Sequence, residues 1–163
     1  MIIKMEDLPK IRETHKDKKI VCCSGSFDLV HVGHILFFED CKKHGDILVT
    51  LVGSDEMIKF NKGPQRPILN QHIRLKTIDS LKPVDYCSLD IVSTRDNPLL
   101  LLDILFEKLK PDVYIVNDDA FDMEYRERIT QRLGIKLVVL PRFCPPEFDA
   151  VSTSKIIETI KKI

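Results

Sequence analysis

Short apolar runs alternate with longer amphipathic segments along most of the chain. Four of the runs are almost continuously apolar, and the first three stop at a glycine or a polar residue. This pattern is typical of strands buried on both faces of a parallel sheet. We therefore expect strands over residues 20–24, 47–52, 112–116 and 135–140, with a weaker one over 85–92.

The segments between these runs carry apolar residues at helical spacing, and glycine or proline marks several of their ends. Pro98 suits the first turn of a helix. The expected helices cover residues 33–44, 70–81, 98–110, 124–133 and 152–163, with a short amphipathic helix or covering arm within 4–19. Residues 61–67 hold one glycine and two prolines among charged residues, which predicts a loop.

Strands that alternate with helices predict an α/β fold, a Rossmann-like doubly wound parallel sheet of about five strands. A chain of 163 residues fits one domain, with an N-terminal helical arm over 1–19 and a core over 20–163. In such a sheet, ligands bind at the carboxyl ends of the strands, where the strand order reverses. The loop after the first strand is therefore the first place to look for a site.

Composition narrows the classes of function. The 25 Lys and Arg balance the 25 Asp and Glu, which argues against a broad basic field that holds nucleic acid or an anionic membrane. No apolar stretch approaches the ~20 residues of a membrane span, and the start does not resemble a secretory signal. The five cysteines have no Cys-x-x-Cys spacing, which favours reduced core thiols. We expect a cytoplasmic protein without nucleic-acid or membrane partners.

The segment after the first expected strand carries the most specific chemistry. Residues 24–28 read Ser-Gly-Ser-Phe-Asp, and residues 31–34 read His-Val-Gly-His. A helix that begins here offers free backbone N–H groups to an anion, and the glycines let a phosphate approach the backbone. Two imidazoles at this position can donate hydrogen bonds to phosphate oxygens and stabilise developing charge. The alternatives are an ordinary helix cap or half of a metal site.

These motifs resemble the signature of the cytidylyltransferase-like nucleotidyltransferases, among them the adenylyltransferase domain of ADP-heptose synthase and glycerol-3-phosphate cytidylyltransferase. Further similar segments follow in the family's order: residues 53–56, 62–67, 117–119 and 151–155. The resemblance covers roughly residues 20–163. It implies nucleotidyl transfer, in which a phosphate of the acceptor attacks the α-phosphorus of a nucleoside triphosphate and pyrophosphate leaves, without a covalent enzyme intermediate.

The resemblance also implies roles for individual residues. Four are expected to stabilise the transition state: His31, His34, Lys62 and Arg74. The expected nucleotide-binding residues are Ser24, Gly25, Ser26, Phe27, Gly33, Asn117, Asp118, Asp119, Arg142, Ser152 and Thr153. Asp28 and Arg66 are expected to bind the acceptor substrate. No protein metal ligand is expected, because Mg²⁺ would be held mainly by the nucleotide phosphates and water.

Several of these residues have a plainer interpretation. Ser152 and Thr153 suit a helix cap, Arg74 a surface ion pair, and Lys62 a solvated loop. Either role is compatible with the residue types alone, and the company of the other motifs favours the functional one.

The choice of substrates depends on fewer residues. Residues 62–67, Lys-Gly-Pro-Gln-Arg-Pro, resemble the loop of the heptose-phosphate branch, which favours ATP and a sugar phosphate such as heptose 1-phosphate. Residues 117–119 and 143–150 depart from the patterns of the named relatives. The alternatives are therefore a CTP-dependent cytidylyltransferase for glycerol 3-phosphate or another small phosphate, and an FMN adenylyltransferase.

Two interpretations come from other classes. One is a nucleotide-binding regulatory module without catalysis. The other is a fragment of a class I aminoacyl-tRNA synthetase, which the lack of a KMSKS-like loop and of a basic surface disfavours. Members of the family are commonly dimers, so we expect a homodimer.

Overall fold

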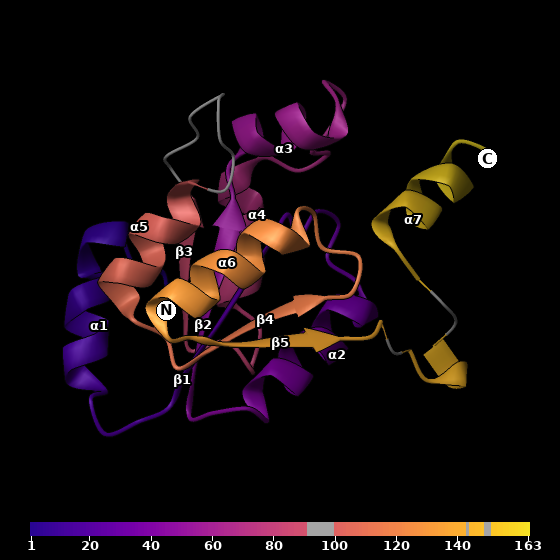
Figure 1. Cartoon of the computed structure of the whole chain (residues 1–163). Helices are drawn as coiled ribbons and strands as arrows, with labels where there is room; N and C mark the ends of the chain where they lie inside the picture. The colour runs from indigo at the N-terminus through magenta and orange to yellow at the C-terminus, as the bar shows by residue number, and fades with distance from the viewer. Residues whose placement is uncertain (91–99, 143, 149–150) are drawn as a thin grey trace.

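The structure is a computed structural model that describes residues 1–90, 100–142, 144–148 and 151–163. Five parallel strands form one sheet in the order β3-β2-β1-β4-β5 (Figure 1). The strands are β1 Ile20–Gly25, β2 Ile47–Gly53, β3 Tyr86–Asp90, β4 Val113–Asn117 and β5 Lys136–Leu140. The expected doubly wound sheet is confirmed, and its strand order reverses between β1 and β4.

Helices connect the strands and cover both faces of the sheet (Figure 1). They are α1 Leu8–Thr14, α2 Val32–Lys42, α3 Asp55–Lys62, α4 Gln71–Asp79, α5 Leu100–Leu109, α6 Met123–Leu133 and α7 Thr153–Ile160, with 3-10 turns η1 Met5–Asp7 and η2 Pro146–Phe148. Pro98, the expected first residue of the helix over 98–110, lies outside the described residues, and so does the end of the strand predicted over 85–92.

Helix α3 falls where the sequence analysis assigns no helix. The hydroxyl of Ser54 caps it by accepting from the Met57 backbone N–H at 3.3 Å, and Asp55 and Glu56 lie in its first turn. Acidic residues at this end are stabilised by the helix dipole. The helix continues to Lys62, so the loop begins at Gly63 and not at residue 61, as the sequence suggested.

Alternate residues of the central strands pack into two hydrophobic cores, one on each face of the sheet. Cys22 and Tyr114 belong to the core under α1, α5 and α6, whereas Val21 and Cys23 belong to the core under α2 and α4. Burial on both faces explains why the strands read as continuous apolar runs. Four of the five cysteines are buried and free, as expected: Cys22, Cys23, Cys41 and Cys87. Cys144 is only partly buried, so the core position expected for it is wrong.

The N-terminal arm is part of the first core. Leu8 and Ile11 of α1 are buried in it. Arg12 donates to the Asp112 carboxylate at 3.0 Å and to the His15 carbonyl at 2.7 Å, which ties the end of α1 to the start of β4. The amphipathic helix expected in this segment is confirmed.

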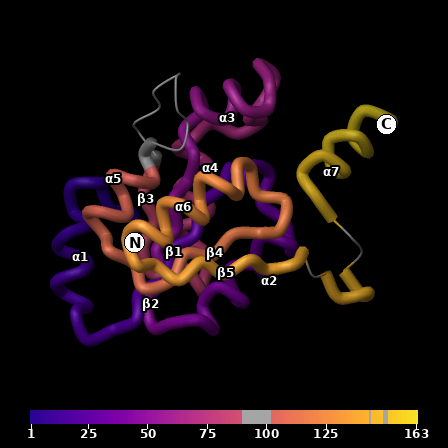
Figure 2. The backbone as a smooth tube through the Cα atoms, viewed as in Figure 1, coloured from indigo at the N-terminus to yellow at the C-terminus, as the bar shows by residue number. Residues whose placement is uncertain are grey.

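The last helix, α7, stands apart from the sheet in the backbone trace (Figure 2). Its start is fastened to the turn after β1, because the Thr153 hydroxyl donates to the Asp28 carbonyl at 2.6 Å. In the part of the chain that the structure describes, no helix is both long and apolar enough to cross a membrane.

Candidate functional site

His31 caps α2 and presents a hydrogen-bond donor at the carboxyl end of β1. Its backbone is extended, and its Nδ1 accepts a hydrogen bond from the Gly33 N–H at 3.2 Å. Because Nδ1 accepts, the proton of the neutral ring is assigned to Nε2, which is left to donate. A Cβ on Gly33 would lie 3.0 Å from the ring carbon Cε1 of His31, so glycine also makes room for this imidazole.

The two imidazoles of the motif lie against each other. The ring centroids of His31 and His34 are 4.0 Å apart at an interplanar angle of 27°, and Phe27 meets His34 edge-on at 5.6 Å. The Nδ1 atom of His34 is buried and has no hydrogen-bond partner among the described residues. An unpartnered polar atom at the candidate anion site is consistent with a site that awaits a ligand.

Burial keeps both imidazoles neutral. It is the main cause that lowers the pKa of His34 to about 3, and His31 adds to the effect. Arg142 and Lys62 lower this pKa further, so both cations lie close enough to act on the ring. Burial, followed by the charge of Arg142, also lowers the pKa of His31. At neutral pH both rings are therefore neutral hydrogen-bond donors near Arg142 and Lys62, and the Asp28 carboxylate acts on the pKa of His34 in the opposite direction.

The turn between β1 and α2 is held in an unusual backbone conformation. Phe27 and Leu29 have positive φ angles of 46° and 49°, although neither is a glycine. The Phe27 ring folds back over Gly25, where a Cβ would lie 2.8 Å from ring carbon Cζ. Such conformations persist only where the surroundings enforce them, and they are common at functional sites.

Asp28 is almost fully buried, and its carboxylate is occupied by protein donors. It accepts from Arg66 Nε at 3.0 Å and from the backbone N–H groups of Ile68 and Leu69 at 2.9 and 3.0 Å. We expected Asp28 and Arg66 at the acceptor substrate. The structure brings them together, but it pairs them with each other and so fastens the loop over residues 63–69 to the turn after β1.

Arg74 is completely buried and has a comparable role. Its guanidinium donates to the Ser26 carbonyl at 2.6 Å, to the Leu69 carbonyl at 2.9 Å and to the Asp55 carboxylate at 2.8 Å. These contacts make Arg74 a positioning residue for the turn and the start of α3. The phosphate contact that the resemblance implies for it stays a prediction.

Lys62 and Arg142 are the cations that remain accessible beside the histidines. Lys62 ends α3, and partial burial followed by the charge of Arg66 lowers its pKa, although Asp28 acts in the opposite direction. Arg142 follows β5 and pairs with Asp119 at 2.6 Å, with both side chains more than half exposed. An exposed pair of this kind is weak and exchanges readily for a charged ligand.

The remaining expected residues lie around the same edge of the sheet. Asn117 ends β4, and Asp118 donates its backbone N–H to the Leu140 carbonyl at 3.1 Å. Ser152 caps α7 by accepting from the Lys155 N–H at 3.2 Å. The capping role of Ser152 is thus confirmed, whereas nucleotide binding by these residues stays a prediction.

Sequence reasoning missed two polar residues that reach this edge, Tyr114 and Arg126. The Tyr114 hydroxyl lies 2.7 Å from the Ser24 hydroxyl and also accepts from Arg126. Nothing in the sequence distinguishes Tyr114 from an ordinary core tyrosine, or Arg126 from a surface residue of a polar helix.

The side chains that the structure describes do not by themselves form a site for Mg²⁺. Among the residues whose placement is described, no three His, Cys, Asp or Glu side chains are grouped so as to hold a metal. The carboxylate of Asp28 is occupied by hydrogen bonds, and that of Asp119 is paired with Arg142. The residues present therefore do not fit a cation held by carboxylates of the protein.

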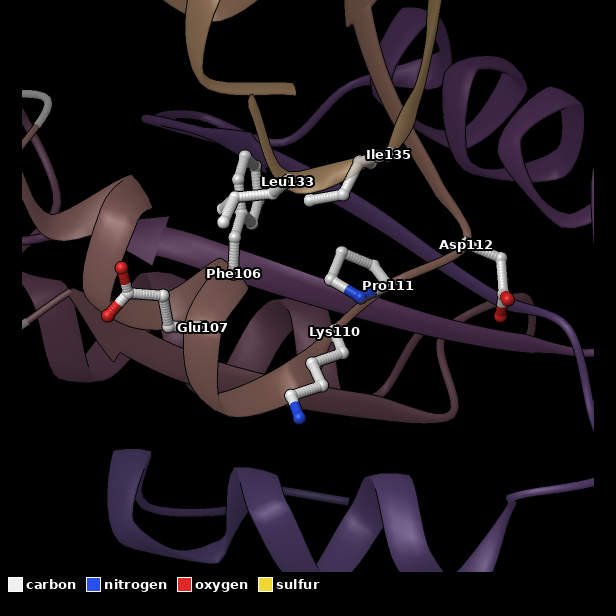
Figure 3. Close-up of a pocket in the computed structure, with 8 residues that line it drawn as sticks. Phe106, Glu107, Lys110, Pro111, Asp112, Leu133 and Ile135 are labelled. Carbon is white, nitrogen blue, oxygen red and sulfur yellow. The ribbon is translucent and has the colours of Figure 1, made fainter. Parts of the chain in front are cut away.

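A separate hollow of about 540 Å³ lies at the opposite end of the sheet (Figure 3). Its lining includes Pro111 and Asp112, which precede β4, and Ile135, which precedes β5. These residues lie at the amino ends of the strands, away from the histidines. Ligands of doubly wound sheets bind at the carboxyl ends, so we place the candidate site there.

Known proteins resemble this chain over most of its length. Bifunctional protein HldE of Helicobacter pylori (strain P12) is 35% identical over 160 residues, which cover 98% of this chain but 31% of that protein. The chain thus spans about a third of the length of this bifunctional relative. FAD synthase of Ferroglobus placidus is 34% identical over 144 residues, which cover 88% of each chain.

Solved structures agree on the fold. A lipopolysaccharide core biosynthesis protein from Thermoplasma volcanium is 29% identical with a TM-score of 0.62, over 78% of this chain and 98% of that one. The alignment with pantoate-beta-alanine ligase from Francisella tularensis covers 100% of this chain and 78% of the ligase chain, with a TM-score of 0.66. At 17% identity, this second likeness concerns the fold alone.

The family comparison covers both the histidine motif and the start of the last helix. Residues 22–159 match the Cytidylyltransferase-like family. The match includes β1 from Cys22 onward, the turn with its paired imidazoles and every later strand of the sheet. The chain therefore belongs to the cytidylyltransferase-like family of nucleotidyltransferases.

Proposed function

We propose that the chain transfers an adenylyl group from ATP to a small phosphorylated acceptor and releases pyrophosphate. The observation that carries the proposal is the stacked pair His31 and His34 at the start of α2. The pair lies where the strand order reverses, and a helix start in this position favours phosphate groups.

The residues around the pair suit a reaction in which negative charge accumulates. An oxygen of the acceptor phosphate attacks the α-phosphorus of ATP, and the bond from that phosphorus to the bridging oxygen of pyrophosphate breaks. Pyrophosphate leaves with the electron pair of that bond. Neutral imidazoles donate hydrogen bonds to the phosphate oxygens, and Lys62 and Arg142 offset the growing charge.

Positioning is the second contribution of the protein. Asp28 and Arg74 hold the turn after β1 against the loop over residues 63–69 and the start of α3. A rigid turn fixes the imidazoles relative to the phosphates, and fixed geometry lowers the entropic part of the barrier. We therefore assign these two residues to the support of the site.

We also propose that Mg²⁺ accompanies the nucleotide. A magnesium ion of this kind is bound by phosphate oxygens and water and supplies charge neutralisation when present. The protein groups of the described site do not form a carboxylate cage for it, so we assign it no protein ligand.

A sugar phosphate such as heptose 1-phosphate is the acceptor that we favour. The loop over residues 62–67 and the similarity to HldE over 98% of the chain support it. FMN is the second candidate, because the similarity to an FAD synthase covers 88% of both chains, and FAD is the adenylylated form of FMN. CTP with glycerol 3-phosphate is the third candidate pair, because the family is named after cytidylyl transfer.

A screen of pyrophosphate release tests the proposal. Each of ATP, CTP, GTP and UTP is combined with sugar 1-phosphates, glycerol 3-phosphate and FMN in the presence of Mg²⁺. We expect turnover with ATP and one acceptor class, and its loss in His34→Asn at saturating nucleotide. Folded protein that releases no pyrophosphate with any pair would contradict the proposal and favour a nucleotide-binding regulatory module.

We propose in addition that the chain forms a homodimer, as the resemblance implies. Sedimentation velocity at micromolar concentration tests this directly. A dimer mass is expected, and a monomer over the whole concentration range would contradict it.

A further inference from the structure

Three polar side chains form a chain of hydrogen bonds from α6 to the carboxyl end of β1. Arg126 of α6 donates from its terminal guanidinium nitrogen to the Tyr114 hydroxyl of β4. The Tyr114 oxygen in turn lies 2.7 Å from the hydroxyl oxygen of Ser24 in β1. Tyr114 is fully buried, Arg126 is 8% exposed, and Ser24 is half-buried at the edge of the sheet.

The direction of these hydrogen bonds follows from chemistry. A guanidinium only donates, so the Tyr114 oxygen accepts from Arg126. Either hydroxyl could donate across the pair of Tyr114 and Ser24, but Tyr114 is fully buried and no other acceptor for its hydrogen is found among the described residues, so we assign that hydrogen to the Ser24 oxygen. The hydrogen of the Ser24 hydroxyl is left over, and no acceptor for it is found among the described residues. Ser24 therefore ends the chain as a donor.

The chain keeps this direction over the working pH range. Burial raises the pKa of Tyr114 to about 12, against the opposing effect of Arg126, so the phenol keeps its proton. The guanidinium of Arg126 is a cation, and within the described part of the chain its hydrogen bonds go to the Phe121 carbonyl and the Tyr114 hydroxyl, not to a carboxylate. Its other hydrogen bond goes from Nε to the Phe121 carbonyl at 2.8 Å. Its charge is therefore available to polarise the phenol and, through it, the serine.

Ser24 lies at the point where the strand order reverses. The pairing of β1 with β4 runs to Cys23 and Ile115, and Ser24 is the next residue along β1. It precedes Gly25 and the turn that leads to the histidines. Ser24 thus lies near the carboxyl end of β1, the end of the strands at which doubly wound sheets bind nucleotides.

We propose that Arg126 and Tyr114 are positioning residues that fix the Ser24 hydroxyl as a hydrogen-bond donor to an oxygen of the bound nucleotide. This inference rests on the proposed function, because it requires a nucleotide in the crevice between β1 and β4. We call Arg126, Tyr114 and Ser24 together the serine relay.

The alternative is that the same contacts only stabilise the core. Both interpretations expect Tyr114→Phe to lower the free energy of unfolding. They differ in nucleotide affinity, because only the relay makes the effects of Tyr114 and Ser24 on binding depend on each other. Residues that act as one unit give non-additive effects in a double-mutant cycle.

The experiment measures the dissociation constant of Mg·ATP by isothermal titration calorimetry, together with KM and kcat once an acceptor is known. The variants are Ser24→Ala, Tyr114→Phe, their combination and Arg126→Lys. The matched control is Tyr86→Phe, which removes a phenol that bonds His15 at the start of β3, far from the site.

We expect Ser24→Ala and Tyr114→Phe each to raise the dissociation constant roughly tenfold, the worth of about one hydrogen bond. The double variant is expected to bind no worse than either single one. Tyr86→Phe should bind as the wild type does, and the losses should appear in KM more than in kcat.

Three results would overturn parts of the account. Wild-type protein that binds none of the four nucleoside triphosphates overturns the proposed function, and the relay with it. Wild-type protein that binds ATP no better than Ser24→Ala does overturns the relay alone. Additive losses in the double variant also overturn the relay. Because Ser24 is half-buried, Ser24→Ala gives an answer even if Tyr114→Phe fails to fold.

Discussion

The Asp28 carboxylate and the Arg66 guanidinium form an ion pair, with Oδ2 2.9 Å from a terminal nitrogen of the arginine. The carboxylate is 1% exposed and the arginine side chain 15% exposed. This pair joins the turn that carries the paired histidines to the loop after α3. The ion pair therefore holds together two segments that the resemblance assigns to phosphate binding.

Removal of the Asp28 carboxylate should destabilise the turn after β1 and the loop after α3 that it joins. Asp28→Ala leaves Arg66 and two backbone N–H groups without their partner, and we expect it to lower the free energy of unfolding by about 3–5 kcal/mol. Urea unfolding followed by circular dichroism measures the change. The control is Asp40→Asn, which breaks an exposed pair with Lys43 and should leave stability almost unchanged. Wild-type stability of Asp28→Ala would show that the carboxylate does not hold the loop.

Arg74 should behave as a structural residue first. Lysine has a single terminal nitrogen and cannot reach the Ser26 carbonyl, the Leu69 carbonyl and Asp55 together, so Arg74→Lys should lose stability. Arg74→Met leaves Asp55 unpaired as well and should lose about 3 kcal/mol or more. Thermal unfolding and ATP titration are measured on the same samples. A lysine variant with native stability but weakened ATP binding would instead support a direct phosphate contact.

His34 should make stability depend on pH in a defined direction. Its pKa falls from 6.5 to about 3 on folding, so the unfolded chain binds the proton more readily than the native one. The contribution of neutral His34 to the free energy of unfolding is complete above pH 6.5 and is lost as the pH falls from 6.5 toward 3. We expect the wild type to lose more stability between pH 7.5 and pH 5 than His34→Asn does. Equal losses in urea unfolding at the two pH values would contradict the low pKa.

Arg142 should affect binding more than stability. Its pair with Asp119 is exposed, so Arg142→Ala should cost less than about 1 kcal/mol of stability. Loss of a charge-assisted contact to phosphate should raise the ATP dissociation constant roughly tenfold. Arg132→Ala is the matched control, since Arg132 is similarly exposed and pairs with Asp103 on α5. If both variants bind ATP equally well, Arg142 does not contact the nucleotide.

The fold was largely predictable because each central strand is buried on both faces. Continuous apolar runs of this length, each bounded by a glycine or a polar residue, are typical of strands inside a parallel sheet. Helix α3 was missed because it is short and mostly polar, and Ile58 is its one buried residue. Its cap at Ser54, followed by two acidic residues, was the signal available in the sequence.

The site was predictable in part. The position of the histidine motif follows from local order, since a glycine turn and a helix start come directly after a strand. The pairing of Asp28 with Arg66 joins residues 38 apart, and the contact of Arg74 with the Ser26 carbonyl joins residues 48 apart. Residue types cannot identify such partners before the fold brings them together. Some charged residues that the sequence assigned to ligand binding, such as Asp28 and Arg66, therefore form an ion pair with each other.

The central claim is that His31 and His34 hold the phosphates of a nucleotide. A crystal structure of the protein with bound Mg·ATP tests it most directly. We expect phosphate oxygens within about 3 Å of a ring nitrogen of each histidine, with Lys62 or Arg142 on the same phosphates. ATP bound elsewhere, while the two rings stay buried against Phe27 or hold a zinc ion, would contradict the account.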